Sequence, residues 1–212
     1  MTTKKLPKKS AKTGAKAAAP AVRAELAVAE FASAAAFERW LRVQHTKSPG
    51  IWLRLMKKTS DQPGVSYAEA LEIALMFGWI DGQTKTYDEK SWLRKFVPRA
   101  PRSIWSKINR AKALALIAEK RMQPAGLAQV ERAKQDGRWH AAYDSPSNAT
   151  PPPDFAAALA ASPRASAFFA TLNGANRYSV LFRVQAPKKP ETRARKITEL
   201  IEMLEQGKKI HG

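Results

Sequence analysis

Apolar side chains recur at helical spacing in the first third of the chain. Ser33 can cap a helix that carries Phe37 on its apolar side and ends before Pro49-Gly50. Ser66 and Glu69 have the spacing of a capping box, in which the hydroxyl and the carboxylate each satisfy a backbone N–H of the other residue. The pattern therefore predicts two helices here.

Three short segments instead alternate apolar and polar residues, as half-buried strands do: 51–57, 79–87 and 92–97. Polar turn residues around Asp88 and Glu89 join the last two. Pairing through such a short turn is antiparallel. We therefore expect a small antiparallel sheet of about three strands.

The pattern becomes helical again after these strands. Ser103 can cap a stretch that runs to about residue 120, and Pro124 suits the first turn of another helix that Asp136-Gly137 ends. Residues 141–153 are rich in Pro, Ser, Asn and Thr, a composition typical of a linker. We therefore expect an α+β N-terminal domain over residues 29–140.

Beyond the linker, helical periodicity covers residues 155–160, 163–172 and 191–205. Residues 177–185 alternate in a way that fits a strand as well as a helix, and their helical neighbours favour a helix. The predicted fold class is α+β and helix-dominated. The N-terminal domain holds the small sheet, and residues 154–212 form a helical C-terminal region.

Charge is the unusual feature of the composition, with 37 Lys and Arg against 18 Asp and Glu, a net +19. Residues 1–28 are a Lys-, Ala- and Pro-rich segment with few large apolar side chains to offset the entropy of ordering. They predict a disordered tail that can be removed with little change in melting temperature. The body is basic without it, so nucleic acid or another polyanion is a plausible partner.

The chain has no Cys, which excludes disulfides, a thiol nucleophile and Cys-based metal sites. The apolar run at residues 17–22 is shorter than a secretory signal needs, and no run reaches the length of a membrane span. We therefore expect a cytoplasmic protein. His45, His140 and His211 lie in unrelated positions, outside any hydrolase, metal or phosphate-loop motif. We predict no catalytic residue, metal or cofactor.

Four runs of sequence together resemble the bacterial YdeI/OmpD-associated family, also described as bacteriocin-protection proteins. The runs are GWIDGQ (78–83), FVPRAPRSIWSKIN (96–109), RMQPAGLAQVERAKQDGRW (121–139) and KKPETRARKI (188–197). The resemblance implies a cytoplasmic bacterial protein linked by name to resistance, stress, a porin or the envelope. Bacteriocins are usually cationic, so a protein at +19 repels them, and protection is expected to be indirect.

One group of residues near the predicted hairpin carries the most chemistry. Asp81 and Arg94 can form an ion pair on one face of the two strands, which is a structural role. Alternatively, Arg99 and Arg102 beside a helix that begins at Ser103 can bind a phosphate or carboxylate. The candidate ligand-binding residues are Trp79, Asp81, Arg94, Arg99, Arg102, Ser103 and Trp105.

Three hypotheses of function follow. The first is a non-enzymatic stress or bacteriocin-protection protein that acts indirectly. The second is a nucleic-acid-associated protein that binds the phosphate backbone through the Lys-rich tail and residues 94–121, where nine basic residues accompany one acidic residue, Glu119. The third is an enzyme with an anion pocket near Asp81, Arg99 and Arg102.

Overall fold

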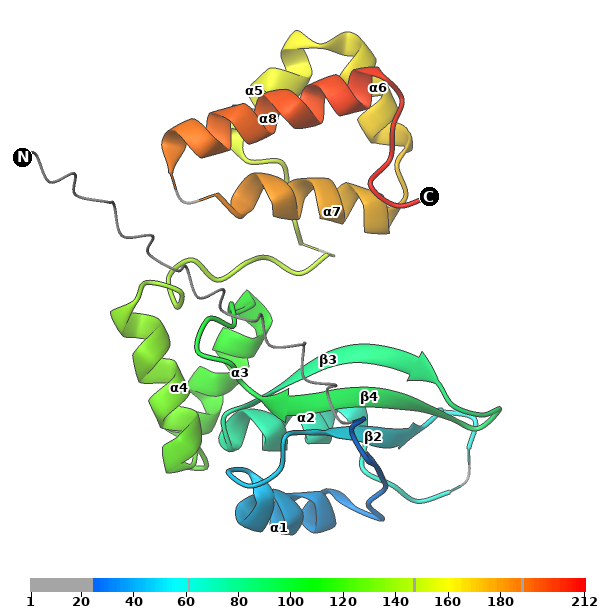
Figure 1. Cartoon of the computed structure of the whole chain (residues 1–212), viewed down its shortest axis with the longest axis vertical. Helices are drawn as coiled ribbons and strands as arrows, with labels where there is room; N and C mark the ends of the chain where they lie inside the picture. Colours follow the sequence, from blue (N-terminus) through cyan, green and yellow to red (C-terminus); the bar gives the residue numbers. More distant parts are fainter. Residues whose placement is uncertain (1–24, 61, 147, 188) are drawn as a thin grey trace, which may run out of the picture.

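The computed structural model describes residues 25–212, apart from residues 61, 147 and 188. The predicted tail lies almost entirely outside the described residues. Two hydrophobic clusters organise the rest, one formed by residues up to Ala142 and one by residues from Phe155 onward. We call the parts built around them the N-lobe and the C-lobe (Figure 1).

The N-lobe is built on a four-stranded sheet in the order β1-β2-β4-β3. The strands are β1 (Val28–Ala29), β2 (Ile51–Met56), β3 (Trp79–Thr86) and β4 (Ser91–Pro98). The three predicted strands are present and pair antiparallel with one another, β2 with β4 and β4 with β3. The sheet is nevertheless mixed, because β1 adds in parallel to β2. Two residues are too few to show an alternating pattern, so the sequence gives no sign of this strand.

The N-lobe helices are α1 (Ala34–Gln44), α2 (Tyr67–Met76), α3 (Lys107–Ala118) and α4 (Pro124–Gln135). Ser33 caps α1, and the capping box of Ser66 and Glu69 opens α2, as predicted. The prediction for Ser103 is wrong. Its backbone closes a turn to Ala100, and the helix begins three residues later, where the Ser106 hydroxyl accepts from the N–H of Asn109.

The C-lobe is helical throughout its regular structure. It comprises α5 (Pro153–Ala161), α6 (Pro163–Thr171), α7 (Gly174–Gln185) and α8 (Pro190–Glu205). The ambiguous residues 177–185 belong to α7, so the helical interpretation is confirmed. None of the described helices is long and apolar enough to cross a bilayer.

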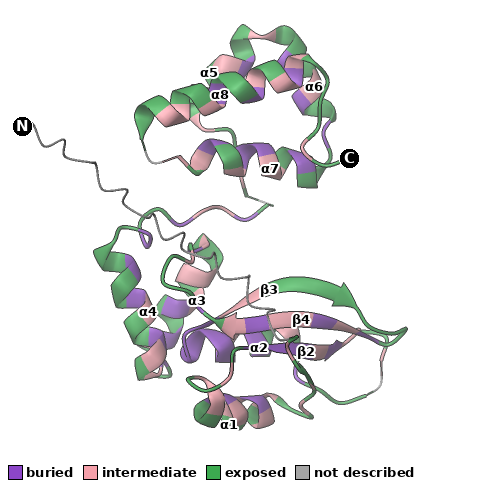
Figure 2. Ribbon diagram, viewed as in Figure 1, coloured by how far each residue is buried: buried purple, intermediate pink, exposed green. Residues whose placement is uncertain are grey.

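Packing explains which sequence positions are buried. On β2 the side chains of Ile51, Leu53 and Leu55 point into the larger cluster, where α1 and α2 cover this face of the sheet (Figure 1). Figure 2 shows that β3 is exposed along most of its length. The fold class is therefore α+β and helix-dominated, with one face of the sheet buried under helices.

Candidate functional site

Asp81 and Arg94 form the ion pair that the sequence suggests. The Nε of Arg94 donates to Asp81 Oδ2 over 3.0 Å, its Nη2 contacts the same oxygen, and the Tyr67 hydroxyl donates to it over 2.8 Å. The two side chains are only 11% (Asp81) and 23% (Arg94) exposed. Burial, and then the hydrogen bond to Asp81, raise the pKa of Tyr67 to about 12. This carboxylate holds the hairpin to α2.

Trp79 also has a structural place. Its ring is buried in the main core against Trp40, at 5.8 Å between centroids in an edge-to-face arrangement. Its indole N–H donates to the backbone carbonyl of His45 over 3.0 Å. A buried indole needs such an acceptor, so Trp79 ties β3 to the end of α1.

The anion site predicted at Arg99, Arg102 and Ser103 does not form. Arg99 is buried, stacks 3.8 Å from the centre of the Trp105 ring and donates to the carbonyl of Ile104 over 3.0 Å. Burial lowers the pKa of Arg99 to about 10, and the charge of Arg138 acts in the same direction. Arg102 is exposed in a turn. The three groups do not converge, because Arg99 is buried against Trp105 whereas Arg102 is exposed in the turn.

A pocket of about 160 Å³ lies next to this turn, between the two lobes. Arg138 lies in its wall and is held by a hydrogen bond to the carbonyl of Ser103, over 2.6 Å, and by the carboxylate of Asp136. The aromatic rings of Tyr143 and Phe182 meet edge to face at 5.5 Å. The lining residues are Ile104, Arg138, Ala141, Tyr143, Phe182, Gln185 and Ala186.

This pocket could hold a small, largely apolar molecule with a polar end near Arg138 or Gln185. Burial raises the pKa of Tyr143, which therefore stays a neutral hydroxyl at physiological pH. The sequence analysis missed the pocket, because its residues come from three separate segments with no shared motif. The nearest signal in the sequence is the Pro- and Ser-rich connection, because it marks a boundary between two apolar regions and ligands often bind at such boundaries.

The basic segment 94–121 is less available to a phosphate backbone than its composition suggests. Besides Arg94 and Arg99, Lys107 pairs with Asp144, and Lys112 pairs with Glu72. Arg110 donates to the carbonyl of Trp139, and Arg121 pairs with Glu119. Within the part of the chain that the structure describes, Arg99 and Arg110 are held by carbonyl groups, and the cations of this segment with neither an acidic partner nor such a carbonyl contact are Lys95, Arg102 and Lys120.

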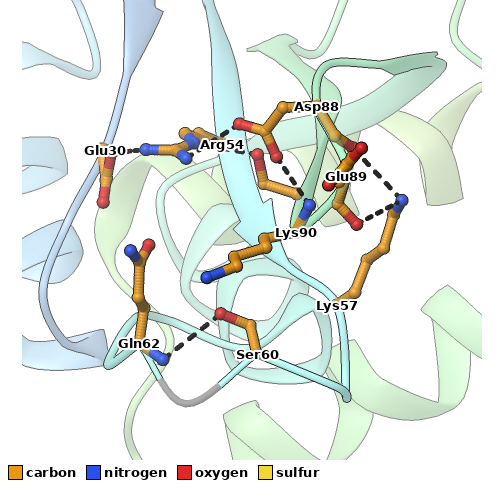
Figure 3. A network of polar contacts seen from close by, with 9 residues as sticks. Glu30, Arg54, Lys57, Ser60, Gln62, Asp88, Glu89 and Lys90 are labelled. Carbon is orange, nitrogen blue, oxygen red and sulfur yellow. Dashed lines mark hydrogen bonds and ion pairs between the residues drawn. The ribbon is translucent and has the colours of Figure 1, made fainter.

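A network at the far end of the sheet was also missed (Figure 3). Arg54 on β2 donates to Ser91, Glu30 and Asp88 over 2.7 to 2.9 Å. The nearby Lys57 ammonium donates to the carbonyls of Asp88 and of Glu89. The network fixes the β3–β4 turn against β2 and β1. Among the described residues, no group of three His, Asp or Glu is placed to hold a metal ion.

Comparison with known families also divides the chain into two parts, one match ending at residue 129 and the other beginning at residue 148. Residues 148–207 match the family described as "Bacteriocin-protection, YdeI or OmpD-Associated". The C-lobe belongs to this family. Residues 29–129 match a different family, a domain of unknown function, DUF8412. No curated protein and no solved structure matches the chain.

The matches narrow the resemblance to the last of the four runs. The run at 188–197 lies inside the YdeI/OmpD-associated region, and the family is confirmed there. The runs at 78–83 and 96–109 lie in the other domain, and the run at 121–139 begins in it. The inter-lobe pocket thus has walls from both sides: Phe182, Gln185 and Ala186 come from the YdeI/OmpD-associated region.

Proposed function

We propose that this chain is a non-enzymatic bacterial stress and bacteriocin-protection protein that acts indirectly, from the cytoplasm, by binding a small ligand in the inter-lobe pocket. The family of the C-lobe supports the role in protection. The observation that carries the ligand hypothesis is the pocket itself, since it is formed jointly by the family-matched α7 and by the N-lobe.

The polar groups that the sequence singles out support the fold, which favours a binding role over a chemical one. Asp81 accepts from Tyr67 and Arg94, and Arg99 stacks on Trp105. The charges and hydrogen bonds of these groups stabilise the fold. A ligand bound in the pocket would contact both lobes. It would favour the arrangement of the lobes that it binds best, and a binding protein transmits a signal through such a shift.

The charge of the chain supports an indirect action. A protein at +19 repels cationic peptides at a distance, so sequestering a cationic bacteriocin is electrostatically unfavourable. Protection would then come from a downstream change in the cell, and the protein would not bind the bacteriocin.

A survival assay tests both parts. A bacterial host without its own copy is complemented with the parent chain and challenged with a cationic bacteriocin. Ala186→Trp fills the pocket, and Ala157→Trp places the same ring on the exposed side of α5 as the matched control. We expect the parent and Ala157→Trp to protect, and Ala186→Trp to lose most of the protection at equal protein level.

Calorimetry of the purified parent with the bacteriocin should show no binding. If the parent gives no protection, the family role does not hold for this chain. If Ala186→Trp protects as well as Ala157→Trp, the pocket has no part in it. Tight binding of the bacteriocin would replace the indirect action by direct capture.

A further inference from the structure

The face of the sheet turned away from α1 and α2 has an unusual composition. Along β2 the side chain of Trp52 alternates with the core residues and lies on this opposite face, paired across the sheet with Lys95 and, in parallel, with Val28. We call this surface the open sheet face. Its residues are Val28, Trp52, Lys85, Tyr87, Leu93 and Lys95.

Two lysines cover the indole ring at its centre. The ammonium of Lys85 lies 4.3 Å from the centre of the Trp52 ring, and that of Lys95 lies 6.0 Å away. Trp52 is only 6% exposed, and it does not belong to the main core cluster. Neither lysine has an acidic partner among the described residues. Their charges are therefore available to an anion.

The neighbouring cation is in a different state. Arg54 pairs with two carboxylates, those of Glu30 and Asp88, so these three groups add no positive charge to the surface and together carry one negative charge. Its guanidinium lies 5.4 Å from the ring of Tyr87, which is 52% exposed. The face thus has one ring under two cations without acidic partners and a second, exposed ring next to an ion-pair network of one cation and two carboxylates.

We infer that the open sheet face binds single-stranded nucleic acid. Single strands offer what this face lacks: phosphates for the two ammonium groups and unpaired bases for the aromatic rings. When Lys85 and Lys95 move from the ring to phosphates, they uncover Trp52 for a base. Each ammonium group then contacts a phosphate, which carries a full negative charge, in place of the ring. The Trp52 ring stacks on a base in place of the ammonium groups.

The backbone leaves room for this approach. The sheet register shifts between Asp81 and Thr84, and Gly82 lies in the irregular part. A Cβ at Gly82 would lie 3.7 Å from the Cβ of Lys95, so the missing side chain belongs to the open face. The strand is therefore bare beside Lys95, where a base or sugar can approach the backbone closely. The bases of a duplex are paired and stacked inside it. Its phosphates can therefore contact the lysines, but its bases cannot stack on the aromatic rings.

Fluorescence anisotropy with a labelled single-stranded oligonucleotide, and with a duplex of equal length, tests the inference on the full chain. Lys85→Gln with Lys95→Gln removes the two free charges, and Lys208→Gln with Lys209→Gln removes two exposed charges from the C-lobe as the control. We expect the first pair to weaken single-strand binding at least tenfold and the control less than threefold.

Salt dependence and ring contacts give independent readouts. Losing two phosphate contacts lowers the slope of log K against log salt by about 1.4, at about 0.7 per contact for single strands. Tyr87→Ala, at an exposed position, should weaken single-strand binding and leave duplex binding unchanged. Single strands should also quench tryptophan fluorescence more than duplex does. Equal losses for the two lysine pairs, or equal binding of duplex and single strand, would mean diffuse charge attraction and overturn the inference.

Discussion

The two lobes stabilise their cores in different ways. The N-lobe packs aromatic rings against a sheet, mostly tilted or edge to face, and also buries polar groups, including Arg99 and Arg138. The C-lobe packs the helices α5 to α8 around Phe155 and Phe169, and the buried polar side chain in its described part is the neutral Asn176. The N-lobe thus carries buried charge that must be matched, and the C-lobe keeps its charged pairs near the surface.

The position of the tryptophans makes this difference measurable. All 6 tryptophans of the chain fall at or before residue 139, in the N-lobe. Tryptophan fluorescence therefore follows the unfolding of the N-lobe alone, while far-UV circular dichroism follows helices in both lobes. Two separate domains remain a prediction until these signals are compared.

The largest expected effect comes from the C-lobe core. Phe155 is fully buried and meets Phe169 edge to face at 5.8 Å. Phe155→Ala should lower the free energy of unfolding of the C-lobe by about 3–5 kcal/mol, because it leaves a cavity. Denaturant titration by circular dichroism should show an early loss of helix, with the fluorescence transition unmoved. Ala156→Ser, on the exposed side of the same helix, is the control.

If fluorescence and circular dichroism instead shift together in Phe155→Ala, the lobes unfold as one cooperative unit. The contacts between them would then be stronger than the Tyr143–Phe182 ring pair and the hydrogen bond from the Tyr178 hydroxyl to the carbonyl of Asp144 suggest. The two hydrophobic clusters would then be parts of one domain.

A smaller effect is expected from the buried ion pair of the N-lobe. Asp81→Ala leaves Arg94 and the Tyr67 hydroxyl without their shared acceptor. Removing one partner of a buried pair costs about 3–5 kcal/mol. We expect the low end of this range, since Arg94 is 23% exposed and water can replace part of the contact. The fluorescence transition should move to lower denaturant.

Asp81→Asn is the matched variant, because it keeps an oxygen acceptor and removes the charge. It should lose less stability than Asp81→Ala. A normal fluorescence transition in Asp81→Ala would contradict the structural role of this carboxylate and return it to the candidates for ligand binding.

Local signals in the sequence predicted the elements well. Ser33, the capping box of Ser66 and Glu69, and Pro124 act through neighbouring backbone groups, so their roles can be read from spacing alone. Ser103 and Ser106 compete for one helix start. The burial of Trp105 and the turn at Ala100 decide between them, and neither is visible in the local pattern.

Tertiary placement explains what the sequence could not predict about the sites. The pairing of Asp81 with Arg94 follows from hairpin formation, and it was foreseen because the turn is short. The stack of Arg99 on Trp105 reverses the expected role of Arg99, since a guanidinium in the core cannot meet a solvent anion. The alternation along residues 51–57 places Trp52 opposite Leu53, but only the packing of the helices shows which of the two faces is the core.

The smallest expected effect separates the lobes by pH. In the C-lobe the Arg193 guanidinium donates to both carboxylate oxygens of Asp154, over 2.6 and 2.8 Å, and lowers the pKa of that carboxyl. A carboxylate with a lowered folded pKa stabilises the protein above its unfolded pKa, near 4 for Asp, and loses that contribution as the pH falls through the folded value. Asp154 is 46% exposed, so the contribution is about 0.5–1 kcal/mol. Asp154→Asn should therefore destabilise the C-lobe by this amount at pH 7, with the difference from the parent vanishing at the acid end.

Denaturant titrations by circular dichroism between acid pH and pH 7 measure this difference in stability, with tryptophan fluorescence as the reference for the N-lobe. Glu202→Gln, at an exposed position on α8 without an ion-pair partner among the described residues, is the control and should show no such trend. A constant difference at every pH would mean that Asp154 stabilises the start of α5 through its uncharged contacts, and the surface ion pair would then contribute nothing to the C-lobe.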